Sequence, residues 1–318
     1  MSKFFKQTQR VSSTPSQRGP QSLDATPLNI ESLLETINER VDEQPSGLVT
    51  SPSELNAVPD VDAARGCQPP ACDVVEFTTE PYRQMHIPRS AERILFPERS
   101  TTPPSPEIES YWRLRTRLLR LQVNRGFRTV VISSAAKGEG KTLTGINLAL
   151  CFAQLPEFKV LLFDADFRTR GLSRLLGDPD SPGVAEVLAG DAQPDAAVLA
   201  TDVPNLYVMG AGQSSMSPPK LFTGAPWKHL IAWAKDQFNL VLVDAPPVLP
   251  VADFELIAAG CEGILLVVRA RVTTREMLTT LMGQVDSSKL LGIALNSVTD
   301  VDHNHLGYYY YYDDRTKK

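Results

Sequence analysis

The chain contains little cysteine and histidine, no excess of positive charge and no long hydrophobic run. Its four cysteines need no disulfide in a reducing compartment. Cys67 and Cys72 are separated by four residues and have no second pair, so linker cysteines are favoured over a metal site. The net charge of −5 gives no electrostatic reason to expect nucleic-acid binding.

No uninterrupted apolar stretch approaches the roughly 18–20 residues that a membrane-spanning helix needs. The first ten residues, MSKFFKQTQR, contain too few apolar side chains for a signal peptide. We therefore expect a cytoplasmic protein, whose association with a membrane would come through a partner.

Proline is unevenly distributed, because residues 1–106 hold 14 of the 25 prolines together with many Ser, Gln and Thr. This composition predicts a largely disordered N-terminal segment. Within it, a short amphipathic helix is predicted near 29–41, with Asn29 as N-cap. Its apolar face could pack on the rest of the chain or dock a partner, and the residue spacing does not distinguish between these two alternatives. The face consists of Ile30, Leu33, Leu34, Ile37 and Val41.

Residues 107–298 alternate between helical patterns and short apolar runs, which predicts an α/β domain. A helix is expected from Glu107 to Val123. Runs that are apolar throughout and separated by helices indicate a doubly wound, mostly parallel sheet with right-handed crossovers. The expected strands cover residues 129–133, 160–163, 206–209, 240–243, 264–268 and 292–295.

The strand TVVISS leads through the loop AAKGEGKT, residues 135–142, into the helical pattern LTGINLALCFA, which is a P-loop in its required context. Gly138 and Gly140 let backbone N–H groups turn toward phosphate oxygens. Lys141 would reach the β and γ phosphates, and Thr142 would offer its hydroxyl to Mg²⁺. The usual first glycine is replaced by Ala135. The predicted ATP-binding residues are Ala136, Lys137, Gly138, Glu139, Gly140, Lys141, Thr142 and Leu143.

Lys137 has two readings. It could reach across a dimer to a partner's nucleotide, as a second lysine does in a subgroup of P-loop ATPases. It could also be an exposed loop lysine, and this second reading is favoured.

Carboxylates follow two of the expected strands, at the sheet edge where ligands bind in parallel sheets. Asp164 and Asp166 come after 160–163 and share a side if the strand continues, whereas Asp244 ends 240–243. Such groups suit Mg²⁺ ligation and deprotonation of a hydroxyl. A surface turn for the first two, or a helix N-cap for Asp244, is the alternative. The predicted catalytic residues are Lys141, Asp164, Asp166 and Asp244, with Asp164 as base, and the predicted metal ligands are Thr142, Asp164 and Asp244.

The last segment, residues 299–318, is polar and tyrosine-rich, and five of the eight tyrosines of the chain are consecutive there. Five adjacent aromatic side chains cannot all face a core, so a flexible tail is expected. Acceptance of phosphate is the favoured role, and a stacking platform or docking strip is the alternative. Full phosphorylation would add a charge of about −7 to −10. The predicted acceptors are Tyr308, Tyr309, Tyr310, Tyr311 and Tyr312.

From about residue 107 to 312 the chain resembles the bacterial tyrosine kinases of capsule and exopolysaccharide synthesis. The segments SSAAKGEGKTLTGINLA, LLFDADFRTRGLSRLLG and LVLVDAPPVLPVAD are similar to the family's Walker A, A′ and B segments, and GILLVVRARVTTREM and LLGIALNSV to its last strands. Each segment alone also occurs in septum-positioning and chromosome-partitioning ATPases, whereas the tyrosine cluster does not.

The resemblance implies an ATP- and Mg²⁺-dependent autokinase that phosphorylates its tyrosine cluster in trans and regulates polysaccharide polymerisation and export. It implies that Asn296 contacts adenine. It also implies a homo-oligomer, possibly a ring, through a Glu-x-x-Arg-x-x-Arg helix. Glu109 and Arg115 fit that spacing, but Trp112 occupies the first arginine position and Arg113 is displaced by one.

The implied partners are a membrane co-polymerase, which would activate the kinase at the inner face of the plasma membrane, and a cognate tyrosine phosphatase. Because no membrane span is present in the sequence, the chain resembles the stand-alone form. A switch ATPase that phosphorylates no protein, which Lys137 favours, and a non-catalytic scaffold are the rival readings. The tyrosine cluster opposes the first, and the intact Lys141 and carboxylates oppose the second.

Overall fold

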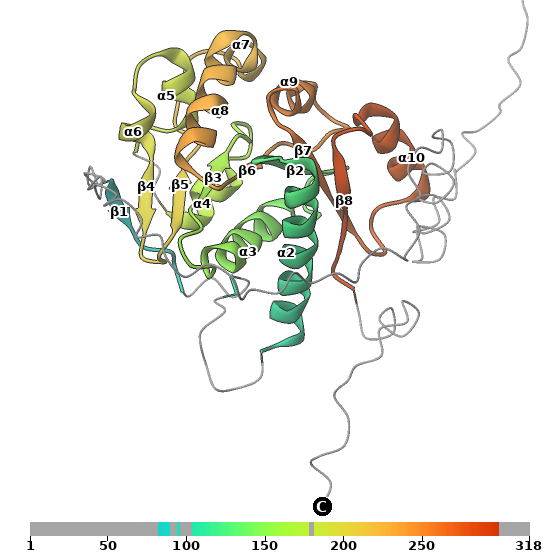
Figure 1. The fold of residues 1–318 in the computed structure, drawn as a ribbon. Helices are drawn as coiled ribbons and strands as arrows, with labels where there is room; N and C mark the ends of the chain where they lie inside the picture. Colours follow the sequence, from blue (N-terminus) through green and yellow to red (C-terminus); the bar gives the residue numbers. More distant parts are fainter. Residues whose placement is uncertain (1–81, 90–93, 96–103, 178–180, 299–318) are drawn as a thin grey trace, which may run out of the picture.

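The computed structural model describes residues 82–89, 94–95, 104–177 and 181–298 (Figure 1). The helix expected near 29–41 and the tyrosine cluster at 308–312 lie outside these residues. None of the helices in the described part of the chain combines the length and apolar character that crossing a bilayer requires.

An eight-stranded sheet forms the centre of the fold, with the strand order β1-β4-β5-β3-β6-β2-β7-β8. Neighbouring strands are parallel except β4 and β5, which are antiparallel. The expected doubly wound, mostly parallel sheet is confirmed. The strands are β1 (Arg83–Met85), β2 (Thr129–Ser134), β3 (Val160–Asp164), β4 (Leu199–Thr201), β5 (Leu206–Met209), β6 (Leu240–Asp244), β7 (Gly263–Arg269) and β8 (Leu290–Asn296).

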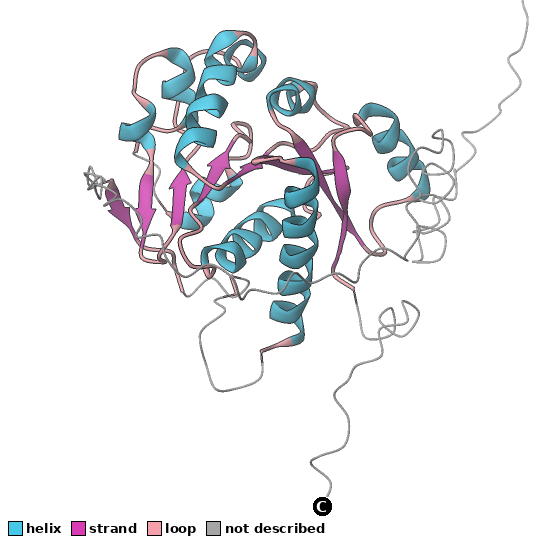
Figure 2. Ribbon diagram, in the orientation of Figure 1, coloured by secondary structure: helices cyan, strands magenta, loops and turns pink. Residues whose placement is uncertain are grey.

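Helices cover both faces of the sheet (Figure 2). One face packs against α2, α3 and α4, and the other against α5 to α10, so that the sheet separates two hydrophobic cores. The helices are α2 (Pro106–Arg125), α3 (Lys141–Ala153), α4 (Gly171–Leu176), α5 (Val184–Ala189), α6 (Pro194–Ala197), α7 (Pro218–Phe222), α8 (Ala225–Gln237), α9 (Asp253–Gly260) and α10 (Arg275–Gln284).

The unbroken apolar runs of the central strands follow from burial on both faces. In β2, Val131 lies in one core, whereas Val130 and Ile132 lie in the other. The same alternation places Phe163 of β3 and Leu162 on opposite faces. Because successive side chains of a strand point to opposite sides, a strand covered on both faces carries apolar residues pointing to both sides.

The helix α2 has matching start and stop signals. The Ser105 hydroxyl accepts a hydrogen bond from the Ile108 amide at 3.4 Å, and Pro106 occupies the first helical position. Gly126 ends the helix at φ 71°, in the left-handed conformation that glycine adopts without strain. The helix expected at 107–123 therefore extends by one residue at its start and two at its end.

Packing begins before residue 107, inside the proline-rich segment 1–106. Strand β1 pairs in parallel with β4, and the nearby Ile87 and Ile94 are buried in the core beneath α3. The Leu95 amide donates to Asn147 Oδ1 of α3 at 2.9 Å. A three-residue strand carries too little periodicity to be recognised in a proline-rich sequence, and β4 was missed for the same reason.

Candidate functional site

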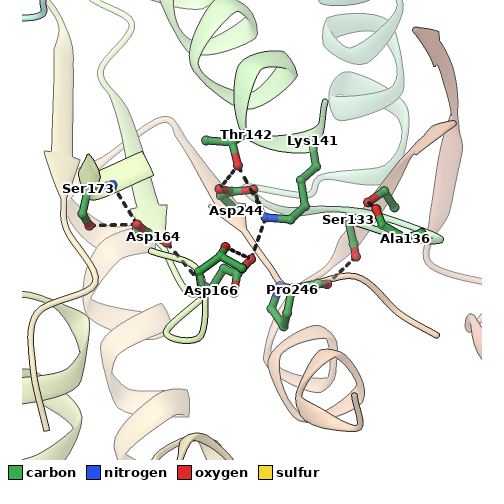
Figure 3. A network of polar contacts seen from close by, with 11 residues as sticks. Ser133, Ala136, Lys141, Thr142, Asp164, Asp166, Ser173, Asp244 and Pro246 are labelled. Carbon is green, nitrogen blue, oxygen red and sulfur yellow. Dashed lines mark hydrogen bonds and ion pairs between the residues drawn. The ribbon is translucent and has the colours of Figure 1, made fainter. Parts of the chain in front are cut away.

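The site lies where β2, β3 and β6 end, because the three strands are neighbours and parallel. The chain turns from β2 through residues 135–140 into α3, and the side chains converge there (Figure 3). Asp164 and Asp244 are direct cross-strand neighbours. The Ser133 hydroxyl donates to the Pro246 carbonyl at 2.6 Å, which ties the end of β2 to the loop after β6.

The loop requires glycine at its last position. Gly140 has φ 99°, and a Cβ atom there would lie 2.0 Å from Asn296 Nδ2. Gly138 also has a positive φ of 87°. The N-terminus of α3, which begins at Lys141, brings its partial positive charge to the same place. Loop and helix together have the backbone geometry of a phosphate cradle, and phosphate binding there stays a prediction.

Lys141 is the cation at the centre of the site. Its Nζ atom lies 2.8 Å from Asp166 Oδ2 and 3.3 Å from Asp244 Oδ1. Burial alone would lower the pKa of the Lys141 ammonium, but the charges and hydrogen bonds of Asp244 and Asp166 outweigh burial and raise it. The lysine is therefore firmly charged and balances two buried carboxylates.

Thr142 and Asp244 present adjacent oxygen atoms. The Thr142 hydroxyl donates to Asp244 Oδ2 at 2.6 Å. Burial raises the pKa of the Asp244 carboxyl to about 6, although the Lys141 ammonium acts in the opposite direction. Two of the three predicted metal ligands are therefore in direct contact, and their binding of a metal stays a prediction.

Asp164 is turned toward α4. Its Oδ2 atom accepts hydrogen bonds from the Ser173 amide and the Ser173 hydroxyl, both at 2.8 Å, and its Oδ1 atom accepts from the Asp166 amide at 3.2 Å. Burial raises the pKa of the Asp164 carboxyl, and the bonds from Ser173 oppose this shift. Both oxygens are therefore engaged, and Ser173 is a residue that the sequence did not reveal.

Asp166 faces Lys141. Its carboxylate also accepts hydrogen bonds from the Thr169 amide at 3.0 Å and the Thr169 hydroxyl at 2.6 Å. Burial alone would raise the pKa of Asp166, but the Lys141 charge and these hydrogen bonds lower it below the ordinary range. Strand β3 ends at Asp164, so Asp164 and Asp166 have different main partners rather than one shared pair of ligand positions.

Glu139 and Asn296 contact the loop itself. The Glu139 carboxylate accepts from the Ala136 amide at 3.0 Å and from the Thr273 hydroxyl. Asn296 Nδ2 donates to the Glu139 carbonyl at 2.8 Å, and Asn296 Oδ1 accepts from the Ser297 amide at 2.8 Å. The contact of Asn296 with adenine stays a prediction, and it would require this amide to exchange or share its present partners.

Two further residues support the loop from the end of β7. Arg269 Nη1 donates to the Gly138 carbonyl at 3.1 Å, and Thr273 follows in the same turn. Their position after a parallel strand is the signal that could have identified them. By contrast, the predicted ligand Lys137 is exposed and Leu143 is half-buried, and their roles stay predictions.

The two predicted oligomerisation residues make contacts within the chain. Arg115 Nη1 donates to the Cys151 carbonyl near the end of α3 at 2.8 Å, and Trp112 Nε1 donates to Gln154 Oε1 at 3.1 Å. Glu109 pairs with Arg113, one turn along α2, at 3.5 Å. Arg115 and Trp112 therefore fasten α2 to α3, and an additional role between subunits stays a prediction.

The oxygen atoms of the site fit Mg²⁺. Within the described ranges no three Asp, Glu, His or Cys side chains gather as a metal site. Mg²⁺ is commonly held by one or two carboxylates together with phosphate oxygens and water. The adjacent Thr142 hydroxyl and Asp244 carboxylate supply such a donor set, whereas Asp164 would first have to release Ser173.

Comparison with known sequences gives relatives that are named tyrosine-protein kinases, although no family model matches the chain. YwqD of Bacillus subtilis is 33% identical over 66% of this chain and 89% of its own length. CpsD of Streptococcus agalactiae is 34% identical over 54% of this chain and 76% of its own. Wzc of Salmonella typhimurium is 29% identical over 64% of this chain but only 29% of its own length.

Solved structures show the same fold. The kinase domain of the Escherichia coli tyrosine kinase Etk aligns with a TM-score of 0.58 and 26% identity, covering 69% of this chain and 89% of that domain. The BceF tyrosine kinase domain aligns with a TM-score of 0.55 and 28% identity, covering 60% of this chain and 78% of that domain. The chimerical protein CapA2B2 aligns with a TM-score of 0.59 over 68% of this chain and 93% of its own length. At 23% identity, this likeness supports the fold and nothing further.

Proposed function

Because the chain belongs to the family of bacterial tyrosine kinases, we propose that it is an ATP- and Mg²⁺-dependent autokinase. It transfers the γ-phosphoryl group to its own tyrosines 308–312, mainly between copies. The observation that carries this proposal is the convergence of Lys141, Thr142, Asp166 and Asp244 at the phosphate cradle. Phosphoryl transfer depends chiefly on positioning and charge neutralisation, which these groups provide.

Each of these side chains has a defined task. Lys141 leaves Asp166 and Asp244 to contact the β and γ phosphates, while amides of the loop and of α3 bind the remaining oxygens. Thr142 and Asp244 would hold Mg²⁺, which neutralises charge on the phosphates when bound. When the lysine turns to the phosphates, Asp166 keeps the hydrogen bonds from the Thr169 amide and hydroxyl.

The transfer forms a bond between a tyrosine oxygen and the γ-phosphorus and breaks the bond to the bridging oxygen, while the tyrosine proton passes to a carboxylate. Asp164 is our candidate for this base and for a third metal ligand. Burial raises the pKa of Asp164, which favours proton acceptance, but the carboxylate must first release Ser173. Asp164→Asn should therefore reduce turnover more than nucleotide affinity.

The tether to the acceptors is long. Tyr308 is twelve residues beyond Asn296, the last residue of β8. A chain of that length spans at most about 40 Å when extended. Because Asn296 contacts the phosphate-binding loop, a chain of that length is long enough to reach the site of its own copy, so a mixing experiment is needed to establish transfer in trans.

The decisive test supplies the full chain with ATP and Mg²⁺ and maps phosphate by mass spectrometry. The wild type should carry phosphate on tyrosines 308–312, and Lys141→Met should carry none. The exposed Lys228 of α8, which lies outside the site, provides a control, because Lys228→Met keeps the central ion pairs. Nucleotide hydrolysis with an unmodified tail would instead support a switch ATPase, for which the exposed Lys137 is the favourable feature.

Transfer in trans is tested by mixing two variants. One carries Lys141→Met with an intact tail, and the other has an intact site and phenylalanine at positions 308–312. Phosphate on the first chain is expected only in the mixture. If neither chain is modified although the wild type alone is, transfer occurs within one copy.

We further propose a membrane co-polymerase as activator, a cognate phosphatase, and recruitment to the inner face of the plasma membrane, with control of polysaccharide polymerisation and export as the outcome. The lengths of the relatives support the co-polymerase alone, since the chain spans 29% of Wzc but 89% of YwqD. The other parts of this proposal rest on the family resemblance. If the wild type alone shows no autophosphorylation, addition of the cytoplasmic segment of such a partner should start it.

A further inference from the structure

We propose that Thr273 and the buried carboxylate of Glu139 form a latch that sets the shape of the phosphate-binding loop. Thr273 would then be a positioning residue for nucleotide, although it follows strand β7 and comes from a segment remote in sequence. The inference rests on the proposed binding of nucleotide and adds a residue to that site.

The first observation is that Glu139 does not face outward from the loop. The residue is 1% exposed, and its carboxylate accepts the Ala136 amide at Oε2 and the Thr273 hydroxyl at Oε1. A buried carboxylate is costly unless its oxygens are hydrogen-bonded, so both contacts are needed to hold it inside. The contact of Glu139 Oε2 with the Ala136 amide joins two positions of the same loop and so holds the loop in one shape.

The second observation is that Thr273 is itself fixed. It is fully buried, its amide donates to the Arg269 carbonyl at 3.0 Å, and its hydroxyl oxygen accepts from the Arg269 amide at 3.1 Å. These two bonds close a turn at the end of β7. Because the Thr273 oxygen accepts from Arg269, the hydroxyl hydrogen is available to Glu139. The loop is thereby held in place by the end of strand β7.

The consequence of losing the hydroxyl follows from the chemistry. Without it, Glu139 Oε1 is left buried and without its donor, so the carboxylate turns toward water and releases the Ala136 amide. The contacts of Arg269 and Asn296 hold only carbonyl groups of the loop and do not replace this link. A loop that samples several shapes binds phosphates less tightly, and we expect about a tenfold weaker nucleotide affinity.

The test uses the full chain with a fluorescent ADP analogue and Mg²⁺, and measures both its Kd and the thermal unfolding midpoint. Thr273→Val should weaken binding about tenfold, and Thr273→Ser, which restores the hydroxyl, should return Kd to within about twofold of the wild type. The neighbouring Thr274 is the matched control. Its hydroxyl accepts from the Met277 amide at 3.3 Å and caps α10, so Thr274→Val should lower the midpoint and leave Kd unchanged.

A double-mutant cycle gives a second, independent measurement. Glu139→Ala should also weaken binding, and adding Thr273→Val to it should weaken binding no further, because both changes open the same latch. If Thr273→Val fails to fold, Glu139→Ala on its own still measures the loss of the latch.

The outcomes separate the latch from the proposed function. A wild type that binds no nucleotide overturns the proposed function. A wild type that binds, together with a Thr273→Val or Glu139→Ala variant that binds equally well, overturns the latch alone. An equal loss of affinity in Thr274→Val would assign the effect to general destabilisation and would also overturn the latch.

Discussion

At the scale of single residues, Lys141 neutralises two buried carboxylates at once. Lys141→Met leaves Asp166 and Asp244 without their cation, and removing one partner of a buried ion pair costs about 3–5 kcal/mol. We expect the free energy of unfolding, measured with urea, to fall by that order. Lys137→Met, at an exposed position of the same loop, should change it by less than about 0.5 kcal/mol. Equal effects of the two changes would contradict the assignment of the central cation.

The residues of the site divide into those that sequence reasoning could find and those that it could not. Thr142 and Asp244 are 102 positions apart, yet both follow recognisable strands, and parallel strands bring their ends together. Ser173 has no motif of its own, and Thr273 has only its position after β7 as a signal. Their contacts with Asp164 and Glu139 depend on how the helices and turns pack.

At the scale of secondary structure elements, β1 tests where the folded unit begins. Ile87→Ala removes a side chain buried beside the strand and should lower the free energy of unfolding by about 2–4 kcal/mol. Gln84 is exposed on the same strand, so Gln84→Ala should change it by less than about 0.5 kcal/mol. Denaturant unfolding of both variants makes the comparison. An unchanged Ile87→Ala variant would place the boundary after β1.

Glu262 joins the starts of β2 and β7 and gives a prediction on pH. Its carboxylate accepts from the Arg128 amide at 2.7 Å and the Thr129 amide at 3.2 Å, and it pairs with Lys235. Burial alone would raise the pKa of Glu262, but the Arg128 and Lys235 contacts lower it below its ordinary value of 4.5. A depressed pKa stabilises the fold above the unfolded value, and this contribution disappears as pH falls through the folded value.

We therefore expect Glu262→Gln to be less stable than the wild type by about 1–2 kcal/mol at pH 7. The difference should begin to shrink as pH falls below about 4.5, because the carboxyl is protonated there in the unfolded chain and only at a lower pH in the folded wild type. Urea unfolding of both proteins across pH 3–7 measures this difference in the free energy of unfolding. A constant difference over that range would show that the charge of Glu262 is not what matters.

The elements that sequence reasoning located were those with a strong pattern. Strands β2, β3, β6 and β7 each contain an apolar run, because both faces are covered, and each is flanked by helical periodicity. Strands β1 and β4 have three residues each, and their pairing is decided by the neighbours that surround them. Strands as short as these therefore lie beyond what a pattern can specify.

At the scale of the whole molecule, charge is the expected control of assembly. The chain carries −5, and full phosphorylation of the tail would add about −7 to −10. If copies associate as proposed, the phosphorylated protein should dissociate, and salt should weaken this effect because it screens exposed charges. Light scattering after gel filtration of phosphorylated and dephosphorylated protein measures it. A variant with phenylalanine at 308–312 should keep its size after exposure to ATP.

The order of the strands also sets the distance between the two edges of the sheet. Strands β1 and β8 are its two edges, and seven inter-strand spacings of about 4.8 Å separate them by roughly 34 Å. Chromophores attached at Gln84 and Ser297 would therefore keep a known separation within one copy. When each copy carries a single dye, any energy transfer in a mixture must come from a neighbouring copy, and its efficiency tells which edges meet.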